Sequence, residues 1–132
     1  MSDSVIAVRR RFKTAYIKGM AMKYMMFVAT DSDPDLDGAA PDVEDWVADV
    51  DGRGVRVTGD RLRPTEDATT VRMRSGELLV TDGPFTESKE WIVGFDVLEC
   101  ADLDEAIEVA SKHPMAYGGR LELRPFWPMD EG

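Results

Sequence analysis

The chain has 132 residues, 43% of them apolar and 32% charged, which predicts one globular domain with a substantial core. Its formal net charge of −10 should repel nucleic-acid phosphates, and no apolar run approaches the roughly 20 residues that a membrane-spanning helix needs. We therefore expect neither a nucleic-acid nor a membrane partner. The single cysteine, Cys100, excludes an internal disulfide and favours a reducing, cytoplasmic location.

The N-terminal segment differs from the rest of the chain in charge. Residues 1–22 hold five basic residues and one acidic residue, a balance of +4, which leaves −14 on the other 110 residues. No strand pattern is present, and no apolar signal region or cleavage site follows the basic start. We interpret residues 1–21 as a basic extension and residues 22–132 as the domain. The extension reflects either an upstream start codon or a peripheral arm that docks on an acidic surface.

The first predicted strand covers residues 23–29. Its nearly continuous apolarity indicates a central strand that is covered on both faces. The following loop, residues 30–40, contains four aspartates that superficially suggest calcium binding. We do not expect a metal there, because Pro34 interrupts the spacing and the glutamate of a calcium loop is missing.

Two amphipathic helices are predicted. Residues 41–53 begin with a proline and acidic residues, continue with apolar residues at helical spacing, and end with glycines. In residues 102–112, Asp102 stands in the N-cap position with Glu105 three residues later, as in a capping box. His113 and Pro114 end this second helix. We expect both apolar faces to pack against the core.

The remaining predicted strands are residues 55–59, 68–74, 77–81, 91–99 and 120–126. Ser75 and Gly76 join the second and third of these as a hairpin, and Gly94 predicts a bulge or a close approach by another group. The order of the elements predicts a ferredoxin-like α+β fold, with two helices on one face of an antiparallel sheet and an inserted β-hairpin. Because the other sheet face also carries apolar residues, we expect a second copy to cover it in a homodimer.

The stretch Asp82-Gly83-Pro84-Phe85 ends a strand with two backbone breakers, which indicates a sharp turn. Asp82 would lie at the mouth of the turn, and Phe85 just beyond it. Lys89 follows with the opposite charge, so the stretch could form a small polar pocket. The alternative is a solvated hairpin loop in which the aspartate caps its own turn.

Other site types are limited by residue counts. One histidine and one cysteine cannot build a zinc tetrad, and no phosphate-binding loop or nucleophile elbow is present, so we predict no metal and no cofactor. His113 lies at a predicted helix C-terminus, where the helix dipole favours its protonated form; its alternative role is to cap that end. Arg61 could bind an anion. Glu122 and Arg124 share a strand face, either as an ion pair or as part of a pocket wall.

Asp82-Gly83-Pro84-Phe85, followed by Glu87, Lys89, Glu90 and Gly94, resembles the signature of the DGPF proteins in the YCII-related family. The opening residues 22–25, the hairpin residues 69–72 and a closing motif that begins at His113-Pro114 extend the resemblance over residues 22–126. The resemblance implies a dimeric α+β barrel. A related branch has a His–Asp dyad in a cleft, but this chain has no histidine near its first strand or helix.

Two functions stay open. One is a cofactor-independent small-molecule enzyme or ligand-binding protein, with Asp82 as acid or base, Lys89 or Arg61 steadying an anionic group, and His113 assisting. The other is a non-catalytic interaction or accessory module. Some relatives occur beside or fused to extracytoplasmic-function sigma factors, so the resemblance implies a partner linked to sigma-factor regulation.

Overall fold

The computed structural model describes residues 21–84 and 89–127. Its strands are β1 (Met22–Thr30), β2 (Arg56–Arg61), β3 (Thr69–Arg74), β4 (Glu77–Asp82), β5 (Ile92–Cys100) and β6 (Gly119–Pro125). Its helices are α1 (Val43–Gly52), α2 (Leu103–Ser111) and α3 (Met115–Gly118), and a 3-10 turn, η1, covers Thr65–Asp67. None of the described helices is long and apolar enough to cross a bilayer.

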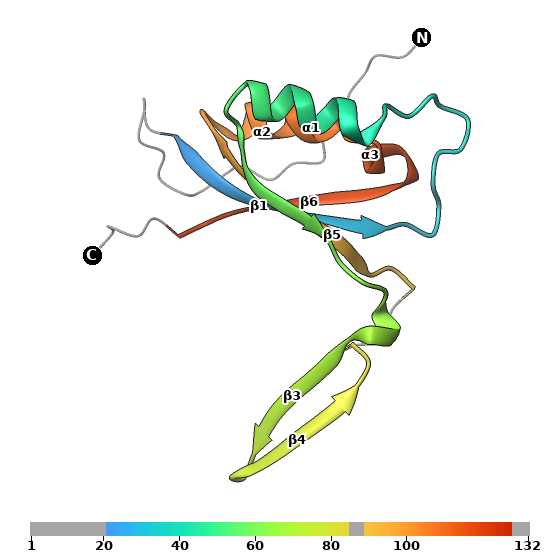
Figure 1. Ribbon diagram of the computed structural model, residues 1–132, viewed down its shortest axis with the longest axis vertical. Coiled ribbons are helices and arrows are strands. Elements are labelled where there is room, and N and C mark those ends of the chain that lie inside the picture. The colour runs from blue at the N-terminus through green and yellow to red at the C-terminus, as the bar shows by residue number, and fades with distance from the viewer. Residues whose placement is uncertain (1–20, 85–88, 128–132) are drawn as a thin grey trace.

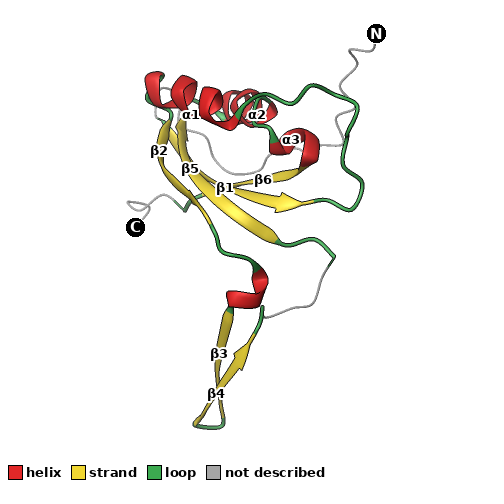
Figure 2. Cartoon of the chain, turned by 45° about the vertical axis from the view of Figure 1, so that its right-hand side comes forward, coloured by secondary structure: helices red, strands yellow, loops and turns green. Residues whose placement is uncertain are grey.

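The main sheet has four strands in the order β2-β5-β1-β6, and every neighbouring pair is antiparallel. The helices cover one face of this sheet, and the β3–β4 hairpin projects away from the other elements (Figures 1 and 2). This arrangement confirms the predicted ferredoxin-like α+β fold with an inserted hairpin.

Strand alternation divides the apolar residues of β1 between the two sheet faces. Tyr24, Met26 and Val28 are buried beneath the helices, whereas Met25 and Phe27 are only half-buried on the opposite face. We call that second face the open sheet face. The continuous apolar pattern of this central strand therefore serves two different surfaces.

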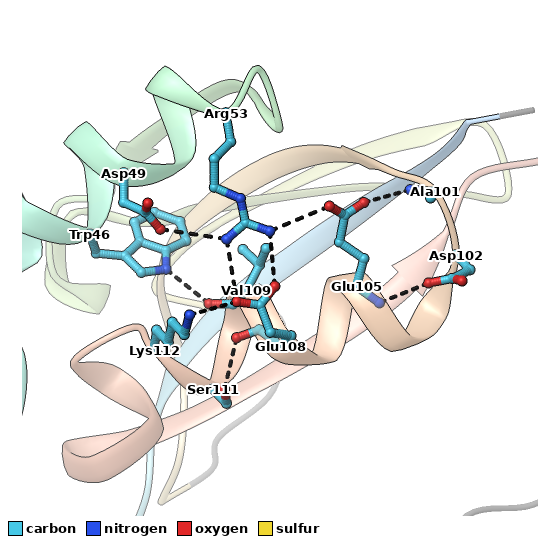
Figure 3. Close-up of polar contacts among 10 residues, drawn as sticks. All are labelled: Trp46, Asp49, Arg53, Ala101, Asp102, Glu105, Glu108, Val109, Ser111 and Lys112. Atoms are coloured by element: carbon cyan, nitrogen blue, oxygen red, sulfur yellow. Dashed lines mark hydrogen bonds and ion pairs between the residues drawn. The ribbon is translucent and has the colours of Figure 1, made fainter.

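The helices pack on the sheet through Trp46 and Val50 of α1 and Val109 of α2. The Trp46 indole Nε1 donates a 2.9 Å hydrogen bond to the carbonyl oxygen of Val109. Arg53, just beyond α1, forms ion pairs with two residues of α2, Glu108 at 2.9 Å and Glu105 at 3.3 Å (Figure 3). Arg53 and then Lys112 lower the pKa of Glu108 to about 2. Polar contacts thus reinforce the apolar packing of the two helices.

The N-terminus of α2 has the capping residues predicted from the sequence, whereas the N-terminus of α1 differs from the prediction. The Asp102 carboxylate accepts a 2.8 Å hydrogen bond from the Glu105 N–H, and Glu105 in turn accepts one from the Ala101 N–H at 2.7 Å. In α1 the N-cap is Asp42, which accepts from the Glu44 N–H, so the proline that was expected to begin the helix lies before the cap. The short α3 and η1 were not predicted.

A buried ion pair joins β2 to β5 on the helix-covered face. The residue Asp96 is 6% exposed, and its carboxylate accepts a 2.8 Å hydrogen bond from Nε of Arg56. Arg56 also donates to the carbonyl oxygen of Gly59 at 3.0 Å. A Cβ atom at Gly59 would collide with the Asp96 carboxylate, so glycine is needed for this close packing. Burial raises the pKa of Asp96, and the Arg56 guanidinium opposes part of that rise.

The β3–β4 hairpin, residues 69–82, forms a separate two-stranded sheet, which we call the arm. Ser75 and Gly76, at φ 51° and 76°, make the tight turn expected at its tip. At its base, the Gly83 N–H donates to the Ala68 carbonyl and the Thr70 hydroxyl donates to the Gly83 carbonyl, both at 2.7 Å. Gly83 has φ 106°, which confirms the sharp turn predicted for this stretch.

Candidate functional site

A groove of about 970 Å³ lies where the arm leaves the main sheet. One wall runs from the end of β2 through η1 to the start of β3, and the other is formed by Pro84 and residues 90–92. Leu62, Trp91 and Ile92 contribute apolar surface and are each 42–47% exposed. The groove therefore offers an open, largely apolar surface that a small organic molecule can contact.

Two arginines lie along the β2 wall of the groove. Arg63 forms a 3.1 Å ion pair with Asp67, and both side chains are exposed. Arg61 has no hydrogen bond or ion pair from its side chain to any residue within 21–84 or 89–127. A guanidinium that is not already paired, beside apolar surface, suits a carboxylate or another planar anion.

The other wall is anchored to the main sheet by polar contacts. Glu90 accepts a 3.2 Å hydrogen bond from Nη2 of Arg120, whose Nε donates to Asp31 at 2.9 Å. The hydrogen bond from Arg120 lowers the pKa of Asp31. The Trp91 N–H donates to the Thr30 hydroxyl at 3.0 Å. These contacts hold the groove wall against the ends of β1 and β6.

The described part of the Asp-Gly-Pro-Phe signature reaches the groove through Pro84. Pro84 lines the groove, whereas Asp82 is the exposed last residue of β4 and is not among the lining residues. Lys89 is also exposed and outside the lining, and Phe85 lies outside the described residues. Arg61 is the predicted site residue that lines the groove.

His113 is buried and lies between α2 and α3 in the sequence, and so belongs to the helix layer. The arm projects on the side of the sheet away from the helices (Figure 1). The ring of His113 packs edge-on against Trp46 at a centroid distance of 4.6 Å, and its Nδ1 accepts a 2.9 Å hydrogen bond from the Met115 N–H. Burial lowers the pKa of His113 to about 4, which is opposite to the direction expected from the helix dipole alone. The ring is therefore neutral at pH 7 and forms part of the core packing.

Glu122 and Arg124 form an exposed ion pair at 3.6 Å on β6. They face the open sheet face, because they lie opposite Phe27 and Met25 in the register with β1. The candidates among the described residues thus lie in three places within one chain: the groove and its margin, the helix layer, and the open sheet face.

Thiol and metal chemistry find little support in the described part of the chain. Cys100 is buried, and burial raises its pKa to about 12, so the thiolate that acts as a nucleophile is scarce at neutral pH. Among residues 21–84 and 89–127, no three His, Cys, Asp or Glu side chains are grouped so that they could hold a metal ion.

The fold and the groove define a small ferredoxin-like α+β protein with a projecting arm. Residues 22–130 match the model of the YCII-related domain, and the chain belongs to the YCII-related family. It is also 45% identical over 69 residues to an uncharacterized protein of Rhizobium meliloti (strain 1021), an alignment that covers 49% of this chain and 54% of that protein. The chain thus spans about half the length of this curated relative. The resemblance to the YCII-related family seen in the sequence is confirmed.

Proposed function

We propose that this protein binds a small organic anion in the groove at the base of the arm. The observation that carries the proposal is Arg61, which lines a largely apolar groove and whose side chain has no hydrogen bond or ion pair with any residue in 21–84 or 89–127. The guanidinium would pair with a carboxylate of the ligand. Trp91 and Leu62 would contact its carbon skeleton.

A chemical step at the margin of this groove would use Asp82 as its acid or base. Asp82 stands two residues before Pro84, which lines the groove, and Lys89 follows the same turn with a charge that would steady an anion. His113 takes no part in this proposal, because it is buried, its ring packs against Trp46 and its Nδ1 is already hydrogen-bonded. The proposal needs no cofactor, and the lone buried thiol suits a cytoplasmic protein.

We also propose that the protein acts as a homodimer in which the second copy covers the open sheet face. Met25 and Phe27 on that face are apolar and half-buried in the single chain. A second copy would remove them from water, which is the main favourable term in such associations.

Thermal unfolding with a panel of small carboxylic acids tests the ligand proposal. We expect an acid to stabilise the wild type, by about 2.7 kcal/mol at a concentration 100 times its Kd. The neutral amide of the same skeleton should have little effect. Arg61→Met should lose the stabilisation, whereas Arg74→Met, at the far end of the arm, should keep it. An acid that stabilises Arg61→Met as much as the wild type would place the site elsewhere.

The role of Asp82 needs a second readout. Asp82→Asn should still bind the acid but should not convert it, as followed by NMR of the ligand. Equal conversion by wild type and Asp82→Asn would remove Asp82 from the chemistry. If the wild type binds the acid but does not convert it, the groove is a ligand-binding site without catalysis.

A second candidate function is a non-catalytic module for a sigma-factor-related partner. The exposed apolar residues Val71 and Leu78 on the arm support an interaction role. A purified extracytoplasmic-function sigma factor should then bind the wild type and bind Leu78→Glu more weakly. Absence of binding, or equal binding by both proteins, would refute this candidate.

A further inference from the structure

The groove at the base of the arm carries acidic side chains as well as arginines. Arg61 and Arg63 lie along one wall together with Asp67, and Glu90 lies on the other wall. Asp67 is already paired with Arg63 at 3.1 Å. A carboxylate that faced the groove would repel an anionic ligand, because like charges close together raise the free energy of the complex. The position of the Glu90 carboxylate therefore decides which charge the groove accepts.

The Glu90 carboxylate is held by residues outside the groove. Its Oε2 atom accepts a 3.2 Å hydrogen bond from Nη2 of Arg120. The same oxygen accepts two more from Ser32, at 3.2 Å from the hydroxyl and at 3.3 Å from the backbone N–H. Neither Arg120 nor Ser32 is among the described residues that line the groove. Among these three donors, Arg120 alone carries a charge.

Arg120 is itself oriented by a second carboxylate. Its Nε donates to Asp31 at 2.9 Å, and the Asp31 side chain is 17% exposed. Asp31 also accepts a 2.8 Å hydrogen bond from the Asp33 N–H. Unlike Glu90, Asp31 is not among the lining residues of the groove. The Arg120 guanidinium thus lies between one carboxylate that belongs to the groove wall and one that does not.

The backbone of this wall is fixed without Arg120. The Trp91 N–H donates to the Thr30 hydroxyl, and the Thr30 N–H donates to the Trp91 carbonyl oxygen, both at 3.0 Å. Loss of the Arg120 side chain would leave this pair of hydrogen bonds in place. It would release the Glu90 carboxylate, because the neutral donors of Ser32 bind a carboxylate less strongly than a guanidinium does.

We propose that Arg120 is a specificity-determining residue that holds the Glu90 carboxylate away from the groove and thereby lets the groove accept anions. This inference rests on the proposed binding of an organic anion, and it names the residue that gives that site its preference for negative charge. With Arg120 in place, both acidic residues among the described lining residues, Asp67 and Glu90, are paired with arginine. Arg61 then supplies the charge that a ligand meets.

Iodide quenching of Trp91 fluorescence tests this role without a ligand. Iodide is an anion and acrylamide is neutral, so the ratio of their quenching constants reports the local charge beside the indole ring. All proteins in the test carry Trp127→Phe, because Trp127 is 88% exposed and would dominate the signal. The third tryptophan, Trp46, is 4% exposed and should be quenched little.

Arg120→Gln should lower the iodide quenching constant by about twofold at low, constant ionic strength. A unit charge roughly 8 Å away in water changes the local concentration of an anion by about that factor. The acrylamide constant should not change, because the wall keeps its backbone hydrogen bonds. No change in the iodide constant would overturn the inference. An equal fall in both constants would also overturn it, because the wall would then have moved.

Two double variants locate the charge that is released. Arg120→Gln with Glu90→Gln should restore the iodide constant, because the carboxylate in the groove wall is gone. Arg120→Gln with Asp31→Asn removes the same charge outside the groove lining and should leave the constant low. Equal recovery in both double variants would overturn the inference. Circular dichroism checks that every variant folds.

The panel of carboxylic acids separates this inference from the ligand proposal. If iodide quenching follows the expected pattern but no acid stabilises the wild type, the ligand proposal fails and the role of Arg120 in the charge of the groove stands. If an acid stabilises the wild type and Arg120→Gln equally, and loses its effect in Arg61→Met, the ligand proposal stands and the inference about Arg120 fails.

Discussion

Removal of the Arg56 guanidinium should destabilise the protein by about 3 kcal/mol at pH 7. Arg56 lies 2.8 Å from the Asp96 carboxylate, and the Asp96 side chain is 9% exposed. Loss of one partner from a buried ion pair costs roughly 3–5 kcal/mol, because the other charge stays buried and uncompensated. We take the lower end of that range because the Arg56 side chain is 20% exposed, so water can enter the space that Arg56→Met leaves.

The cost of Arg56→Met should also depend on pH. Burial raises the pKa of Asp96 from its ordinary 3.8, and Arg56 limits that rise, so the pKa should rise further in the variant. A carboxyl group whose folded pKa is raised contributes stability below its unfolded pKa, and that contribution is lost as pH rises through the folded value. The difference in unfolding free energy between wild type and Arg56→Met should therefore be smaller at pH 4 than at pH 7.

Urea denaturation followed by circular dichroism at pH 4 and pH 7, at one fixed protein concentration, measures this difference. Arg63→Met is the control, because the Arg63–Asp67 ion pair is exposed and should contribute less than about 1 kcal/mol. If Arg56→Met costs less than about 1 kcal/mol at pH 7, or the same at both pH values, then Arg56 does not compensate a buried charge on Asp96.

Two further predictions concern the core. Gly59→Ala should destabilise the protein by about 2 kcal/mol in thermal unfolding, because the added methyl group would collide with the Asp96 carboxylate. Gly52→Ala is the control. A Cβ atom at position 52 meets nothing within 4 Å, so this variant should be neutral or slightly stabilising. The depressed pKa of His113, about 4 against an ordinary 6.5, contributes stability that is present above pH 6.5 and lost as pH falls toward 4. Between pH 7 and pH 4.5, the free energy of unfolding measured by urea denaturation should therefore fall by about 2 kcal/mol more in the wild type than in His113→Phe. If the free energies of unfolding of the two proteins change with pH in the same way, the ring of His113 is not held neutral by burial.

The features that the sequence predicted well depend on short-range interactions. The capping residues Asp102 and Glu105 are three apart, and the hairpin turn needs only Ser75 and Gly76 in left-handed backbone conformations. The alternation along β6 likewise placed Glu122 and Arg124 on one strand face, and Leu121 and Leu123 on the other face pack against the core. Gly94 was expected at a close approach, and a Cβ there would lie 3.0 Å from the Asp60 carbonyl oxygen. For the cap and the turn, the residue type has one good solution within a few positions of the chain, whereas the partner of Gly94 lies on a different strand.

The features that the sequence did not reveal depend on strand register over long separations. Arg56 and Asp96 are 40 residues apart, and Arg120 and Asp31 are 89 residues apart. Neither pair follows from a local motif, because a shift of one residue in either strand would turn the side chains to opposite faces. The groove was missed for the same reason, since its walls come from β2, η1 and the residues before β5.

Local pattern was enough to establish the family, the ferredoxin-like order of strands and helices, and the presence of a hairpin. Tertiary structure decided that Arg61 lines a groove, that His113 is enclosed in the helix layer, and that Asp82 shares a face with Val80 on a projecting arm. The physical reason is that backbone propensities act between neighbours, whereas burial and charge pairing depend on which distant strands meet and in what register.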